Sequence, residues 1–338
     1  MYSFINIAGL SVGMAVAVLI GLWINDELSF NKNFKNYDRL GQLWQFVNFT
    51  GEKASYGVVP IPLADEIRSK YPEFKSVSAS VERKPILSAG EKKFAENGNY
   101  VEPVFTDMLS LKMTAGKSNG LKDINSILLC ATVAKNLFGN ENPIDKLVKI
   151  DEKTSVKVAG VYEDFPDNSG FKDTRFLAPW ALYLTIDKYA QNASTNWDEN
   201  SFLVFVQLKE GADFAKASAK IKNSRMIREN PPPYKPEFFI FPMSRWHLYS
   251  DFKNGVNTGG LIQFVWLFGI TGFFVLLLAC INFMNLSTAR SEKRAKEVGI
   301  RKSVGSVRGQ LILQFLSELG TLPGSTRADR IQSRCAAS

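Results

Sequence analysis

The chain has 338 residues and a formal net charge of +8, long enough for two soluble domains or for one large domain with membrane helices. Its single histidine, His247, excludes a metal site built from several histidines and argues against a hydrolase triad. The three cysteines, Cys130, Cys280 and Cys335, leave only one cysteine between the two apolar ends of the chain. That middle region has no disulfide of its own, so an ordinary hydrophobic core must stabilise it.

The first apolar run covers residues 4–24 and contains no charged residue. Its length predicts a membrane-spanning helix. Gly9 and Gly13 match the small-xxx-small pattern of closely packed membrane helices. A cleaved signal peptide is the competing interpretation. The run is longer than the usual apolar core of such a peptide, no Lys or Arg precedes it, and no A-x-A site follows it.

Residues 26–258 are soluble in character and predict a large α+β domain, in two lobes, between the membrane helices. Strand patterns alternate with short amphipathic helices, and we find no internal repeat or low-complexity segment. The predicted strands are 41–47, 146–151, 155–165 and 201–211, the predicted helices are 61–71 and 214–223, and both kinds of element are predicted within 104–116 and 126–139.

The second apolar run covers residues 261–286 and contains no Asp, Glu, Lys or Arg. As a helix it would rise about 39 Å, enough to cross a hydrocarbon core of about 30 Å with some tilt. A segment dense in Lys and Arg follows at once, so the positive-inside rule predicts that this end is cytoplasmic. Residues 26–258 are then extracytoplasmic. Because the excess positive charge lies beside a membrane span, it does not indicate a nucleic-acid partner.

The basic segment predicts a helix of about four turns over residues 289–304. Apolar positions continue through it, and Gly299 and Gly305 mark a close approach or a turn. This pattern predicts a short helix parallel to the membrane, then a break, then a returning helix. The simpler alternative is a solvated positive-inside loop.

Catalytic motifs are absent from the sequence. Gly116 to Ser118 read GKS, but a P-loop needs glycine five residues before that Gly, and Leu111 stands there. Glu163 and Asp164 are adjacent, and neighbours on a strand point to opposite faces, so they make a poor acid–base pair. We expect a chain that is not an enzyme and that holds no cofactor and no metal.

Several motifs resemble FtsX-like, MacB-type ABC transporter permeases, in particular those of Bacteroidetes-like bacteria. The segment SEKRAKEVGIRKSVGSVRGQLILQFLSE is similar to the family's cytoplasmic coupling helix, which follows the second span and docks on the ATPase subunit. Further similar segments are FINIAGLSVG, NDELSF, LFGNENPIDK, VAGVYEDFPDNSGF and HLYSDF. The resemblance implies that the coupling positions are Arg294, Lys296, Glu297, Gly299, Ile300, Arg301, Lys302 and Gly305.

The resemblance also implies a function and partners. The chain would be a membrane subunit of the bacterial inner (cytoplasmic) membrane, multi-pass, that transmits ATP-driven movement to its extracytoplasmic domain. A separate ABC ATPase would hydrolyse ATP. A second permease subunit, the lipid bilayer, and periplasmic or outer-membrane proteins would be the other partners.

The two ends of the chain depart from the family pattern. The basic elbow before the first span is missing, and residues 289–318, the coupling helix and start of the permease domain, lead to an atypical tail at residues 319–338. Residues 311–322 are too short and polar to span a membrane, and Pro323 and Gly324 follow them. We therefore expect a fragment truncated after the second span.

Two other classes share part of this organisation. A two-span membrane sensor with an extracytoplasmic ligand-binding domain has the same topology, but it requires a signalling domain or sustained heptads after the second span. An anchored extracytoplasmic enzyme would need the catalytic residues that the sequence lacks.

Overall fold

The computed structural model describes residues 2–49 and 51–303 and divides into two compact units. The globular unit comprises Leu22–Gly269. The helical unit joins the chain up to Gly21 with the segment from Ile270 onward. The described residues end at Ser303. They do not include the rest of the predicted coupling segment, residues 304–318 with Gly305, or the predicted tail at 319–338.

Two long helices stand at the ends of the described chain. They are α1 (Tyr2–Ser29) and α8 (Ile262–Ser303). The stretches Ala8–Ser29 and Ile262–Ala289 are long and apolar enough to cross a membrane. Both spans were predicted, and together they flank a mixed α+β domain, as expected. The basic segment is not a separate short helix, because α8 continues from the apolar span to Ser303 as one helix, and the predicted break and returning helix lie outside the described residues.

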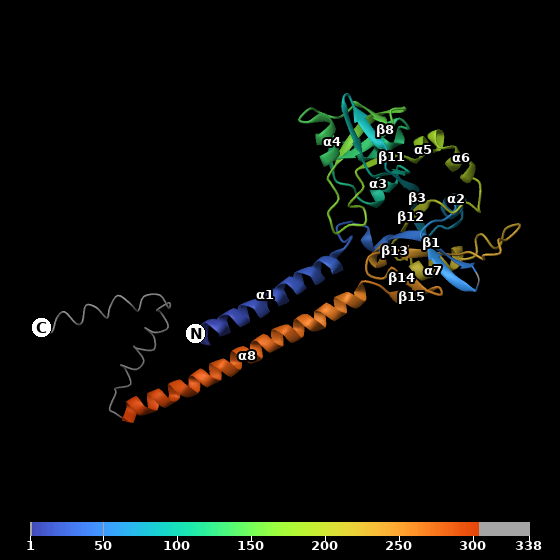
Figure 1. Cartoon of the computed structure of the whole chain (residues 1–338). Coiled ribbons are helices and arrows are strands. Elements are labelled where there is room, and N and C mark those ends of the chain that lie inside the picture. Colours follow the sequence, from blue (N-terminus) through green and yellow to red (C-terminus); the bar gives the residue numbers. More distant parts are fainter. Residues whose placement is uncertain (1, 50, 304–338) are drawn as a thin grey trace. The chain divides into compact units, whose positions relative to one another are not determined.

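The elements of the globular unit are short and numerous (Figure 1). The helices are α2 (Pro62–Lys70), α3 (Phe105–Met108), α4 (Ala131–Phe138), α5 (Trp180–Ile186), α6 (Lys188–Ala193) and α7 (Phe214–Ile221), with single 3₁₀ turns η1 (Tyr37–Arg39), η2 (Ser118–Lys122) and η3 (Met243–Arg245). The strands are β1 (Leu40–Phe49), β2 (Glu52–Tyr56), β3 (Phe74–Arg83), β4 (Ile86–Ala89), β5 (Lys92–Ala95), β6 (Gly98–Val101), β7 (Met113–Gly116), β8 (Ser126–Cys130), β9 (Leu147–Ile150), β10 (Thr154–Tyr162), β11 (Phe176–Pro179), β12 (Leu203–Leu208), β13 (Glu237–Pro242), β14 (Asp251–Lys253) and β15 (Val256–Gly259).

Local sequence explains several of these boundaries. Pro62 occupies the first turn of α2, where its missing N–H costs nothing, and Pro72 follows the end of the helix. Leu63 and Ile67, one turn apart, are both fully buried. Helix α7 is capped by the Asp213 carboxylate, which accepts a hydrogen bond from a backbone N–H of the first turn.

Thirteen strands of the described chain form one sheet, in the order β13-β1-β12-β3-β6-β11-β8-β10-β9-β4-β5, with β2 paired to β1 and β7 to β10. Most pairs are antiparallel, and β8 with β10 and β6 with β11 are parallel. The hairpin β14–β15 forms a separate sheet.

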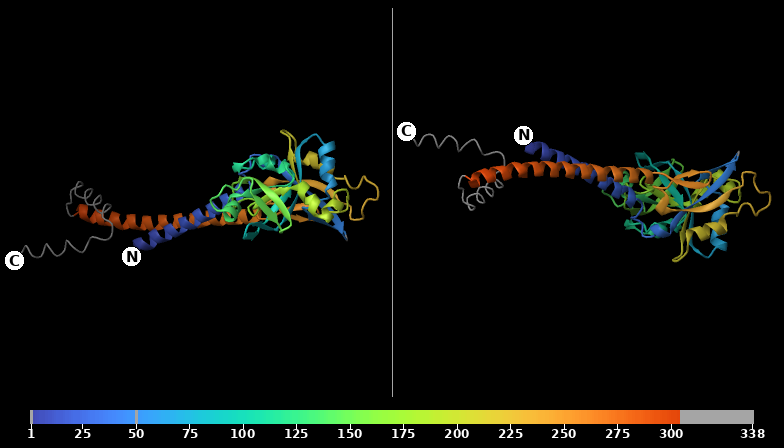
Figure 2. Two further views of the ribbon diagram at one scale, coloured as in Figure 1. Left: turned by 90° about the horizontal axis from the view of Figure 1, so that it is seen from above. Right: turned by 90° about the horizontal axis from the view of Figure 1, so that it is seen from below.

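The sheet carries two hydrophobic cores, which confirms two lobes. The larger core gathers residues of β6, β8, β10 and β11 with α4 and α5, and the smaller one gathers residues of β1, β12 and β13 with α2 and α7. In Figure 1, β8, β11 and α4 lie at one end of the domain, and β1, β13 and α7 lie at the other. Strand β3 serves both cores, because Val77 belongs to the smaller core and Val81 to the larger. The loop between α7 and β13, drawn in yellow to orange, projects from the domain in both views of Figure 2.

Candidate functional site at the ends of the two long helices

The chain just beyond α1 is fixed to the loop at residues 165–171. The backbone N–H of Asn31 donates to the carbonyl oxygen of Asn168 at 2.9 Å, and the Asn31 Oδ1 accepts from the N–H of Gly170 at 2.8 Å. The Asn168 Nδ2 donates to the Oγ of Ser29 at 3.0 Å. Asn31 is fully buried at a φ of 63°, a left-handed conformation that asparagine tolerates better than most residues. The end of α1 and this loop are therefore held by a shared hydrogen-bond network.

His247 holds the end of α1 from a second segment. Its Nε2 lies 2.5 Å from the Glu27 Oε2, and its ring stacks on Phe30 with the centroids 3.9 Å apart and the planes inclined by 8°. Polar and aromatic contacts to the same imidazole restrict the rotation of the helix end.

Aromatic side chains connect these segments to one another. Phe34 packs edge-on against Phe171, with the centroids 5.7 Å apart, and Trp246 packs against the same ring at 6.0 Å. The Trp246 Nε1 donates to the carbonyl oxygen of Phe241 at 2.8 Å. Parts of three segments that carried the family resemblance thus meet here together with Phe34 and Trp246 beside them, and we call residues 25–34, 164–171 and 246–248 the junction. The segment 137–146 forms the end of α4 and the loop after it.

The β14–β15 hairpin precedes α8 and is anchored by one aromatic side chain. Phe252 contacts four rings of β1 and β13 at centroid distances of 5.5–5.8 Å: Trp44, Phe46, Phe239 and Phe241. The N–H of Ile262, the first residue of α8, donates to the carbonyl oxygen of Leu248 at 3.1 Å. Both long helices therefore enter the globular unit through packed, hydrogen-bonded segments.

Asp164 has a structural role at the start of α4. Its Oδ2 accepts from the N–H and Oγ1 of Thr132, and its Oδ1 accepts from Arg175 at 3.1 Å. Burial pushes the pKa of Asp164 upward, but hydrogen bonds from Cys130 and Thr132 and the charge of Arg175 outweigh it and lower the pKa. Burial raises the pKa of the Cys130 thiol to about 12, so this thiol is not a nucleophile. Among residues 2–49 and 51–303, no group of His, Cys, Asp and Glu is placed to hold a metal.

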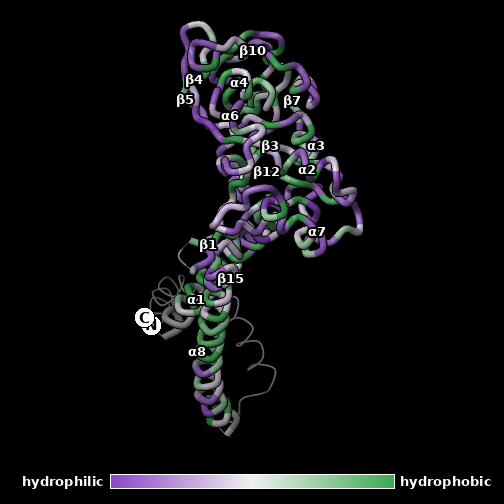
Figure 3. The backbone as a smooth tube through the Cα atoms, turned by 90° about the vertical axis from the view of Figure 1, so that its right-hand side faces the viewer, coloured by the Kyte–Doolittle hydropathy of each residue, from purple (hydrophilic) through white to green (hydrophobic). Residues whose placement is uncertain are grey.

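Seven of the eight predicted coupling positions lie on the last turns of α8, and Gly305 lies outside the described residues. The polarity of α8 changes along its length, from hydrophobic to hydrophilic, as Figure 3 shows. Lys296, Gly299 and Ile300 are exposed, and Ile300 is 62% exposed despite its apolar side chain. A Cβ at Gly299 would meet nothing within 4 Å among the described residues. The seven described positions share one end of α8.

The helical unit contains a close contact between α1 and α8. A Cβ at Gly13 would lie 2.6 Å from the Cβ of Ala279, and one at Gly9 would lie 3.8 Å from the Nδ2 of Asn282. Gly272 of α8 faces Ile20 in the same way. The predicted small-xxx-small pattern is therefore a contact face between the two helices.

Comparison with known proteins bears on this arrangement. Residues 3–224 match the model of the MacB-like periplasmic core domain, and residues 269–322 match that of the FtsX-like permease C-terminal domain. The first match alone covers more than half of the chain. The chain belongs to the MacB-like permease family. This confirms the resemblance seen in the sequence and makes the chain an ABC transporter permease of the FtsX-like type.

Among the relatives of this MacB-like permease are macrolide export ATP-binding/permease proteins MacB. The protein of Aggregatibacter actinomycetemcomitans is 24% identical over 330 residues, 94% of this chain and 48% of the relative. That of Salmonella choleraesuis is 25% identical over 253 residues, 74% of this chain and 36% of the relative. The chain thus spans about half, or less, of the length of these relatives. A crystallised domain of a permease protein from Porphyromonas gingivalis has the same fold, with a TM-score of 0.52 at 17% identity over 62% of this chain and 92% of that one.

Sequence reasoning named coupling positions, which stay a prediction, but it did not indicate that the three segments of the junction lie together. The motifs at 25–30, 158–171 and 247–252 were recognised one by one, yet nothing in their order indicated that they meet. The composition of these three motifs was the sequence signal that could have indicated their contact. Each combines an aromatic residue with Asn, Asp or His, and such side chains are typical of hydrogen-bonded, tightly packed segments.

Proposed function

We propose that this permease transmits movement between an ABC ATPase in the cytoplasm and its own extracytoplasmic domain. The observation that supports this most is the continuity of α8, 42 residues long from the domain to the basic segment. At 1.5 Å per residue this helix is about 63 Å long, twice the thickness of a hydrocarbon core. A displacement imposed at its basic end reaches the other end, because every backbone hydrogen bond of the helix resists bending.

In this proposal the movement reaches the globular unit through the packed segments by which both long helices join it. Phe252 ties the segment before α8 to β1 and β13, and the junction ties the end of α1 to the loop at 164–171. In this proposal a pull on α8 moves the smaller lobe, while α1 holds the junction. The movement is used to export or otherwise act on an extracytoplasmic substrate.

The proposal includes a membrane location and partners. The globular unit lies outside the inner membrane, and the basic end of α8 lies in the cytoplasm, as the positive-inside rule requires. A separate chain supplies ATP hydrolysis, and a second permease subunit completes the transporter. The names of the relatives in which one chain is both ATP-binding and permease support an ATPase as the partner.

Ile300 gives the sharpest test of ATPase docking. Its exposed side chain would be an apolar anchor in a groove of the ATPase, and burying it would contribute about 1.5–3 kcal/mol, or roughly 10- to 150-fold in affinity. The chain is co-expressed and co-purified with a candidate ABC ATPase from the same genome. Ile300→Asp and Gly299→Leu should each reduce the recovered ATPase, whereas Lys293→Ala, which changes one charge on the same helix, should retain it.

Two results decide this experiment. Membrane insertion must be equal in all variants, because none of the substitutions lies in the spans. Equal recovery of the ATPase with every variant would remove the docking role of this segment and leave only a positive-inside signal.

The topology is tested separately with an impermeant thiol reagent on cells stripped of their outer membrane. Ile227, which is 76% exposed in the globular unit, and the exposed Ala295 of α8 are replaced by cysteine one at a time. Labelling at position 227 and protection at position 295 are expected, and the reverse pattern would invert the proposed orientation.

A further inference from the structure

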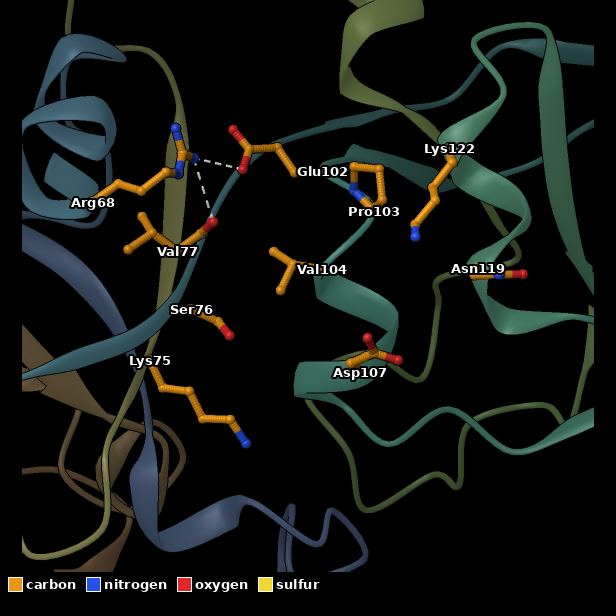
Figure 4. Close-up of a pocket in the computed structure, with 10 residues that line it drawn as sticks. All are labelled: Arg68, Lys75, Ser76, Val77, Glu102, Pro103, Val104, Asp107, Asn119 and Lys122. Carbon is orange, nitrogen blue, oxygen red and sulfur yellow. Dashed lines mark hydrogen bonds and ion pairs between the residues drawn. The ribbon is translucent and has the colours of Figure 1, made fainter.

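A cavity of about 520 Å³ lies in the globular unit where its two cores adjoin (Figure 4). One wall comes from α2 and the start of β3, which belong to the smaller lobe. The other wall comes from α3 and η2, which belong to the larger lobe. Pro103 and Val104 form an apolar shelf between the walls.

Some charged side chains of the cavity are in ion pairs and others are not. Arg68 is engaged by two carboxylates, since it donates to Asp65 and to Glu102 at 2.6 Å each. Lys75 and Lys122, on opposite walls, form no ion pair with any residue of the described chain. In Figure 4 both lysine side chains extend from their walls toward the space between them.

Asp107 limits the charge of any ligand. Its carboxylate lines the same cavity and is also without an ion pair among residues 2–49 and 51–303. Two free lysines and one free aspartate leave a net charge of one positive. The charge set therefore matches a ligand with a single net negative charge.

We propose that this cavity binds a small monoanionic carboxylate with an apolar body. The carboxylate lies between Lys75 and Lys122, and the apolar body rests on the shelf at Pro103 and Val104. Because the two lysines belong to different lobes, the bound molecule bridges the lobes. This site is independent of ATPase docking, since it involves no residue of α8.

The probe is 4-fluorophenylacetate, observed by ¹⁹F NMR on the full chain in lipid nanodiscs, with empty nanodiscs as the blank. Saturable line broadening is expected, displaced by hexanoate at lower concentration than by acetate or inorganic phosphate. Each methylene that the shelf covers should improve displacement by up to about 4-fold.

Three lysine variants locate the binding. Lys75→Gln and Lys122→Gln should each weaken binding by up to about 5-fold, the upper range for a partly solvated charge pair. Lys117→Gln, which removes the same charge from an exposed lysine outside the cavity, should leave binding unchanged. All three variants should unfold at the temperature of the parent chain, because none of these lysines is in an ion pair with another residue of the described chain.

Several outcomes would overturn the proposal. They are the absence of saturable binding above that of empty nanodiscs, an equal loss in Lys117→Gln, and displacement by acetate or phosphate as effective as by hexanoate. The absence of saturable binding would show that there is no site. An equal loss in Lys117→Gln would show only a general attraction to a basic surface. Equally effective displacement by acetate or phosphate would show that the apolar shelf does not contribute to binding.

Discussion

Leucine at Gly13 should separate α1 from α8. A Cβ at this position would lie 2.6 Å from the Ala279 Cβ, roughly 1 Å closer than ordinary carbon–carbon contact. Because Ala279 has no flexible side chain that could move aside, the helices themselves must shift. Overpacking of this kind costs about 1–3 kcal/mol, which corresponds to about 5- to 150-fold in the population of the closed helix pair.

The matched control is Gly21→Leu, because a Cβ at Gly21 meets nothing within 4 Å. Both variants add the same side chain to the same helix, so insertion into the membrane should be equal. The assay is disulfide formation between cysteines placed at Gly9 and Asn282, with the two native cysteines outside the globular unit replaced by serine. The yield should fall several-fold in Gly13→Leu and stay unchanged in Gly21→Leu. Equal yields in the two variants would refute the contact face.

Three further predictions concern the globular unit. Asp164 has a lowered pKa in the folded state, so its stabilising effect is present above the unfolded pKa of about 3.9 and is lost as the pH falls through the folded pKa. Asp164→Asn should reduce stability at neutral pH by about 1 kcal/mol and flatten the acid limb of a thermal unfolding series, and a limb parallel to that of the parent chain would contradict this. Phe252→Ala removes a half-buried ring that contacts four others, at a cost of about 2 kcal/mol, so hydrogen exchange should accelerate across β14 and β15 while α4 stays protected. Asn31→Gly keeps the left-handed backbone and loses only the bond to Gly170, whereas Asn31→Ala also strains the backbone, so alanine should cost about 1–2 kcal/mol more in denaturant unfolding. Equal losses for the glycine and alanine variants would show that backbone conformation does not matter there.

Features with a local cause were predictable from the sequence. An uncharged apolar run of sufficient length predicts a helix that is able to cross a membrane, and α1 and α8 follow from composition alone. The strand β10 and the helix α7 were predicted because alternation and helical periodicity are properties of a few neighbouring residues. The basic segment after residue 289 was recognised for the same reason. Its continuity with the span was not, because Gly299 can either extend or end a helix, and here the helix extends through it.

Only the tertiary structure decided the order of the strands and the convergence of the segments. Short, fully buried strands such as β6 and β11 carry no alternation, and their parallel pairing depends on partners far away in the chain. Asn31 and Gly170 are 139 residues apart, and the positive φ that brings them together has no signature in the residues around Asn31. The cavity between the lobes likewise depends on β3 serving both cores. Composition and periodicity act over one or two turns of chain, whereas register, burial and the pairing of charges are set by the packing of the whole domain.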